Sequence, residues 1–173
     1  MRVLGTGWAS VMAGLGFTVG VRKDGARWAW GYNHVGELGD GTTTNRLRPV
    51  RIGTGTNWAS VSAGGDHTVA VKTDGNLWAW GYNEYGQLGD GTTTNRSRPV
   101  RIGTDTNWAS VSAGGDHTVA VKTDGTLWAW GWNVYGRLGD GTTATRATPV
   151  RIGTHTGWVT VEVGGGHTLA LRR

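Results

Sequence analysis

The chain has 173 residues, with 32 glycines, 11 tryptophans, no cysteine, 17% charged residues and a formal net charge of +5. The lack of cysteine excludes disulfides and thiol chemistry, and the abundance of tryptophan argues against a disordered glycine-rich chain. No run of about 18 apolar residues occurs, so we expect no membrane span, and the basic charge suits either solubility or an anionic partner.

The first residues, Met1-Arg2-Val3-Leu4, lead directly into a repeated sequence. No apolar core of a signal peptide follows them, so we expect no signal peptide in this chain. The sequence leaves the compartment open, and both a cell-surface and a cytoplasmic location are compatible with it.

The chain repeats itself with a period of roughly 50 residues. The string that begins at Trp58 recurs from Trp108 with few changes, a more diverged copy begins at Trp8, and a truncated copy runs from Trp158 to Arg173. We divide the single repeat domain 1–173 into repeats 1–50, 51–100 and 101–150 and a half repeat 151–173. Such a period predicts stacked units, none of which can bury its apolar face alone.

Each copy contains four segments that alternate between apolar and polar residues, and none has a helical period. In the second copy the strands are predicted at residues 58–63, 67–73, 77–81 and 98–102. Asp74 precedes Gly75 between the second and third strands, as Asp124 does in the next copy, which is a strong hairpin signal. Pro99 cannot donate to a ladder, so we place the fourth strand at an outer edge. We predict an all-β fold, a β-propeller-like arc of four-stranded antiparallel blades, with about 3.5 blades per chain.

The segment L-W-A-W-G-x-N-x-Y-G-x-L-G-D-G, with G-G-D-H-T and T-D-G before it, resembles the regulator of chromosome condensation repeat family. The resemblance covers essentially the whole chain and implies a propeller, which in that family has seven blades. The best-known activity of that family is guanine nucleotide exchange on a small GTPase. We carry this activity over to no residue, because the loops here are short and nearly identical.

Fourteen predicted strands make half of a seven-bladed ring. Three explanations remain open: a fragment of a longer propeller, a closed homo-oligomeric ring, or an open arc that joins other copies head to tail. Unpaired strand edges favour such joining. We expect the self-assembly contacts near the two ends, at Trp8, Val11, Val19, Val21, Trp158, Val161, Leu169 and Leu171.

A histidine recurs at one repeat position, as His67, His117 and His167, with Phe17 in the first copy. No second ligand lies at metal-binding spacing, so we interpret it as a histidine that hydrogen-bonds backbone between neighbouring blades. Asp40, Asp90 and Asp140 supply only one carboxylate per loop, which favours an Asx-turn over a calcium site. We expect no metal and no cofactor.

Two tryptophans lie two residues apart on each third strand, so both face the same side. We interpret Trp30, Trp80 and Trp130 as packing between blades, with a role as platforms for sugars or bases as the alternative. Arginines flank the fourth strand, where charge protects an edge from aggregation. A ligand-binding rim at Arg96, Arg98, Arg101, Trp132 and Arg137 is the alternative.

No nucleophile–base pair, phosphate loop or dinucleotide fingerprint occurs, so we expect no enzyme. The leading hypothesis is a structural or scaffold protein that assembles with itself through its half-blade ends. The alternatives are a protein- or glycan-binding module of a larger bacterial surface protein and a fragment of a nucleotide exchange regulator. The chain itself is therefore the first expected partner, other proteins or glycans come next, and nucleic acid and membrane insertion are not expected.

Overall fold

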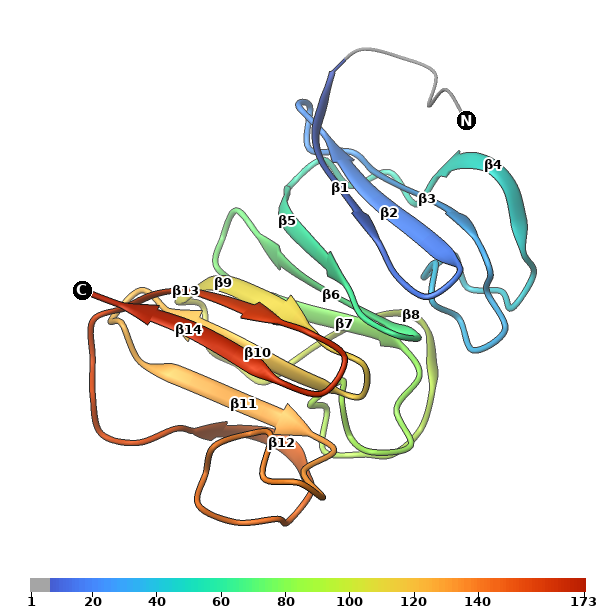
Figure 1. The fold of residues 1–173 in the computed structure, drawn as a ribbon. Helices are drawn as coiled ribbons and strands as arrows, with labels where there is room; N and C mark the ends of the chain where they lie inside the picture. The colour runs from blue at the N-terminus through green and yellow to red at the C-terminus, as the bar shows by residue number, and fades with distance from the viewer. Residues whose placement is uncertain (1–6) are drawn as a thin grey trace.

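The computed structural model describes residues 7–173, and residues 1–6, where we expected no signal peptide, lie outside this range. Within it the chain forms fourteen strands and no helix (Figure 1). No helix that could cross a membrane is therefore found among these residues. The strands are β1 (Trp8–Ala13), β2 (Phe17–Arg22), β3 (Arg27–Gly31), β4 (Arg46–Arg51), β5 (Trp58–Ala63), β6 (His67–Lys72), β7 (Leu77–Gly81), β8 (Arg96–Arg101), β9 (Trp108–Ala113), β10 (His117–Lys122), β11 (Leu127–Gly131), β12 (Arg146–Arg151), β13 (Trp158–Val163) and β14 (Thr168–Arg172).

The strands form three four-stranded antiparallel sheets and one two-stranded sheet, each in simple chain order. We call β1–β4 blade 1, β5–β8 blade 2, β9–β12 blade 3, and β13–β14 the half-blade. The first strands of successive blades contact one another, so the blades lie side by side along an arc (Figure 1). This confirms the predicted all-β arc of about three and a half blades.

The fourth strand of blade 2 begins two residues earlier than predicted, at Arg96, and the second strand ends one residue earlier, at Lys72. Pro99 therefore lies inside β8, on the outer edge of the sheet, where the pairing with β7 is irregular between Ala79 and Gly81. An edge strand with a bulge accommodates proline because its missing N–H is not needed for the ladder.

A β-bulge changes which side chains of β5 share a face. Strict alternation would place Trp58 and Val61 on opposite sides, but the register shifts between Trp58 and Ser60. Both Trp58 and Val61 consequently belong to one buried cluster. The bulge thus recruits a large aromatic residue into the core between blades.

The core lies between neighbouring blades rather than inside one sheet. Between blades 1 and 2, Phe17, Val19 and Val21 pack against Trp58 and Trp80. The same arrangement recurs between blades 2 and 3 and between blade 3 and the half-blade. Each blade therefore needs a neighbour to bury its apolar faces, as expected for a repeat architecture.

Candidate functional site: blade junctions and end faces

At each blade junction, a backbone carbonyl oxygen of the preceding blade accepts hydrogen bonds from side chains of the next blade. The Glu37 carbonyl oxygen accepts hydrogen bonds from Thr68 Oγ1 at 2.9 Å and from Trp80 Nε1 at 2.8 Å. At the next junction Thr118 and Trp130 donate in the same way to the Gln87 carbonyl oxygen. Trp80 and Trp130 are fully buried, which agrees with the predicted packing between blades.

The repeated histidine also joins neighbouring blades, but through a side chain. His67 Nε2 lies 3.0 Å from Thr118 Oγ1, and His117 Nε2 lies 3.2 Å from Thr168 Oγ1. Because the Thr118 hydroxyl donates its proton to Gln87, His67 must donate from Nε2, which leaves Nδ1 unprotonated. The prediction that this histidine bonds to the backbone was wrong in its partner, which is a threonine hydroxyl of the next blade.

Burial lowers the pKa of His67 to about 3 and that of His117 to about 4. Both imidazoles are therefore neutral at pH 7, and they pack as structural groups between blades. His167 occupies the same repeat position on the half-blade and is exposed.

The recurring aspartates form turns and ion pairs. Asp90 Oδ1 accepts from the Thr92 N–H at 3.0 Å, which confirms the Asx-turn, and Oδ2 accepts from Arg96 Nε at 2.8 Å. Asp40 and Asp140 have the same partners in their own copies. In residues 7–173, no three His, Asp or Glu side chains gather as a metal site would require.

The hairpin aspartates also stand where the sequence placed them. Asp74 Oδ1 accepts from the Asn76 N–H, and Asp124 Oδ1 accepts from the Thr126 N–H. Each of these residues stabilises the turn between the second and third strands of its blade.

The two ends of the arc expose surfaces that are buried elsewhere in the chain. We call the side of blade 1 that faces away from blade 2 the head face, and the outer side of the half-blade the tail face. Leu169 and Leu171 on the tail face are 64% and 61% exposed, whereas Val119 and Val121, at the same repeat positions, are 1% and 2% exposed. On the head face Val11 is 43% exposed, against 3% for Val61.

Not every predicted end residue lies on an end face. Val19 and Val21 are buried between blades 1 and 2, and Val161 is buried against blade 3. These three side chains point toward a neighbouring blade of the same chain, because side chains alternate along a strand. Trp158, also predicted as an end contact, packs against the buried cluster between blade 3 and the half-blade. Trp30, which was predicted to pack between blades and not as an end contact, is buried.

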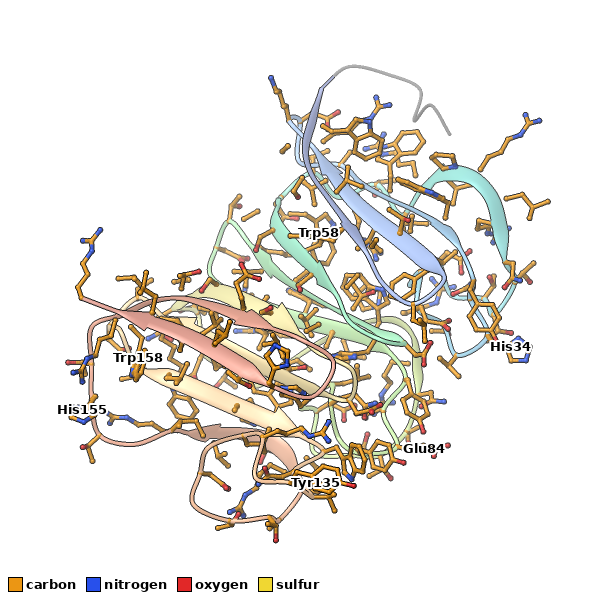
Figure 2. All side chains as sticks on the ribbon, in the orientation of Figure 1. His34, Trp58, Glu84, Tyr135, His155 and Trp158 are labelled. Carbon is orange, nitrogen blue, oxygen red and sulfur yellow. The ribbon has the colours of Figure 1, made fainter. Side chains whose placement is uncertain are left out.

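The predicted ligand rim separates into two places. Tyr85 stacks on Trp132 with ring centroids 5.3 Å apart, and the Arg137 guanidinium lies 4.3 Å from the Trp132 ring. His34, Glu84 and Tyr135 lie along this same margin of the molecule (Figure 2). Elsewhere, Arg96 pairs with Asp90, and Arg101 donates to the Thr104 carbonyl oxygen.

Arg98 lines a pocket of about 420 Å³ between blades 1 and 2. The same pocket contains Arg27, a residue that sequence reasoning missed. The sequence does contain a signal for Arg27: a charged residue stands at a repeat position where the other copies have Leu77 and Leu127.

The sequence profile of the regulator of chromosome condensation (RCC1) repeat matches residues 24–71, 74–121 and 124–171. This chain belongs to the RCC1 repeat family. A second profile of the same repeat matches residues 58–87 and 108–137. No curated protein matches the chain.

Solved structures share the fold of this RCC1-repeat chain at low sequence identity. Prp20p from Saccharomyces cerevisiae, described with its binding to Gsp1p and histones, is 23% identical over 93% of this chain and 42% of its own, with a TM-score of 0.82. Yeast RCC1 (Prp20) bound by Kap60 is 20% identical over 99% and 43%, with a TM-score of 0.85. Human WBSCR16 is 20% identical over 96% and 58%, with a TM-score of 0.69. The chain thus spans about half the length of these structures.

Proposed function

We propose that this RCC1-repeat chain is a non-enzymatic structural protein that associates with further copies of itself, head face to tail face. The observation that carries the proposal is the exposure of Leu169 and Leu171, whose internal equivalents are buried by the next blade. Two leucines in water favour any contact that removes them, by about 1.5–3 kcal/mol per fully buried side chain.

The head face has the groups that an internal blade presents to its predecessor. Trp8, Val11 and Thr18 stand where blade 3 has Trp108, Val111 and Thr118. The Thr118 hydroxyl is hydrogen-bonded to His67 of the preceding blade. Thr18 of one copy is therefore expected to form the same hydrogen bond with His167 of another copy. This correspondence favours a second copy as the occupant of the tail face.

The half-blade also leaves a strand edge open. Within residues 7–173, no strand pairs with the outer side of β14 in the two-stranded sheet β13-β14, whereas β10 has β11 on that side. Unpaired N–H and C=O groups along such an edge readily pair with another chain. A head-to-tail contact is heterologous, so it generates a ring if the rotation closes and a filament if it does not.

The test is light scattering with chromatography over a dilution series of the wild type and the variants V11D, L171D and L47D. We expect the wild type to exceed the 18.3 kDa of one chain at high concentration. V11D and L171D should each remain monomeric, because a carboxylate on an apolar interface must be desolvated. L47D is the control, because Leu47 is also exposed but lies on the outer strand β4.

Mixing V11D with L171D distinguishes head-to-tail joining from other contacts. V11D retains an intact tail and L171D an intact head, so the mixture should form a discrete dimer and nothing larger. A wild type that remains monomeric at every concentration, or an L47D variant that dissociates equally, would refute the proposal.

A further inference from the structure

The pocket between blades 1 and 2 is rich in positive charge. Its walls contain Arg27, Arg51, Lys72 and Arg98, with Asp40 as the only acidic residue. Asp40 is already engaged, because its two oxygens accept from Thr42 and Arg46. Among residues 7–173, none of the four cations that line this cavity of about 420 Å³ forms an ion pair with a carboxylate.

Arg27 is the most deeply placed of these cations and is only 2% exposed. Its guanidinium lies 4.3 Å from the Trp80 ring and 5.0 Å from the Trp58 ring, and its terminal nitrogens donate to the carbonyl oxygens of Leu38 and Gly39. Its Nε is buried without a hydrogen-bond partner among the described residues. Burial lowers the pKa of Arg27 to about 9, and the nearby Asp40 carboxylate offsets this shift only in part.

At the next junction of the same chain a carboxylate neutralises the equivalent lysine. Lys122 lies 4.0 Å from the Trp128 ring, just as Lys72 lies 4.3 Å from the Trp78 ring. Lys122 Nζ is paired with Asp105 Oδ2 at 2.6 Å. The residue equivalent to Asp105 is Gly55, which has no side chain, and within residues 7–173 Lys72 has no ion pair.

The two junctions differ at two further positions of the pocket. Arg27 is replaced by Leu77, and Arg98 is replaced by Thr148. The junction that has a carboxylate thus has fewer cations, and the junction that lacks it has two more. Gly55 itself lines the pocket, and Trp58 lies at the contact of blades 1 and 2 (Figure 2).

We propose that this pocket binds an oxyanion, a phosphate or carboxylate group of a ligand, in the place that the Asp105 carboxylate fills at the next junction. Lys72 supplies the point charge that Lys122 supplies to Asp105. Arg51 and Arg98 supply guanidinium groups at the mouth of the pocket, where their planar forks match oxyanion geometry. The site is separate from the head and tail faces, so it is independent of end-to-end association.

The test is calorimetric titration of the chain with inorganic phosphate and, separately, with succinate, in a low-salt buffer free of other oxyanions. We expect saturable binding of one anion per chain. Tighter phosphate binding indicates a phosphate-bearing ligand, and tighter succinate binding indicates an acidic partner. Chloride at the same ionic strength should displace neither.

Variants that introduce residues found at the same position of other repeats should keep the fold intact. G55D introduces the residue found at position 105, and the site has room, because a Cβ on Gly55 would meet nothing closer than 3.6 Å. Its carboxylate should pair with Lys72 and weaken anion binding at least tenfold. R27L introduces the residue found at position 77 and should also weaken binding.

A matched pair separates a specific site from a general ionic atmosphere. R51A removes a cation of the pocket, whereas R101A removes its equivalent at the next junction. Only R51A should reduce affinity. Anion binding that does not saturate, wild-type affinity in G55D, or an equal loss of affinity in R51A and R101A would overturn the proposal. The mass of the particles, measured by light scattering on the same samples, reports on self-association separately.

Discussion

His67 and Thr118 are 51 positions apart in the sequence, yet the imidazole Nε2 lies 3.0 Å from the threonine hydroxyl oxygen. The bond joins blades 2 and 3, and the same hydroxyl donates a hydrogen bond to the Gln87 carbonyl oxygen. One histidine, one threonine and one carbonyl thus connect three segments of the chain. The first junction has Phe17 instead, so the chain itself contains an apolar version of the same contact.

Replacing His67 by phenylalanine should cost little stability. H67F loses one hydrogen bond, about 1 kcal/mol, but Thr118 retains its acceptor at Gln87 and the ring remains buried as Phe17 is. H67A should lose more, about 2–4 kcal/mol, because it also leaves a cavity. Urea denaturation of both variants measures the difference, and an H67A variant as stable as H67F would contradict it.

The free energy of unfolding should fall as the pH falls from about 6.5 to about 4. The pKa of His67 is lowered to about 3 in the folded chain, so the unfolded chain binds more protons throughout this window. Each such histidine contributes a slope of up to about 1.4 kcal/mol per pH unit. Urea midpoints at pH 7, 6 and 5 should therefore decline less steeply for H67F, and identical slopes would argue against a neutral buried imidazole.

Asp90 should matter more for stability than its ion-pair partner. The carboxylate accepts from Thr92, Asn83 and Arg96, and its side chain is 8% exposed, whereas that of Arg96 is 35% exposed. D90A leaves buried donors unsatisfied and should cost about 1–3 kcal/mol, whereas R96A should cost less than about 1 kcal/mol. Thermal unfolding compares the two variants, with D74A, which alters an exposed hairpin turn, as a milder control.

Gly75 and Gly103 form a matched pair for a backbone test. Both have positive φ, +75° and +63°, which disfavours alanine by about 1–2 kcal/mol. A Cβ on Gly75 would lie 2.0 Å from the Thr106 carbonyl oxygen, whereas a Cβ on Gly103 meets nothing within 4 Å. G75A should therefore lower the melting temperature much more than G103A does. Equal decreases would show that the backbone near Thr106 moves away at little cost in free energy.

Local signals in the sequence determined much of this fold. The copies beginning at Trp58 and Trp108, the alternation in 67–73 and the Asp74-Gly75 turn were sufficient for the blade architecture and for the repeat family. These features are local because strand periodicity and turn geometry depend on neighbouring residues. The bulge after Trp58 was missed, since a register shift depends on the partner strand.

Only the tertiary structure decided which positions of different copies meet. It placed Val19 and Val21 inside a junction rather than on an end face. It also brought Arg27, Lys72 and Arg98 to one pocket, although they come from β3, β6 and β8. The physical reason is that the stacking of blades determines which side chains meet. The surroundings of a repeat position come largely from the neighbouring blade, and the sequence of one copy does not specify them.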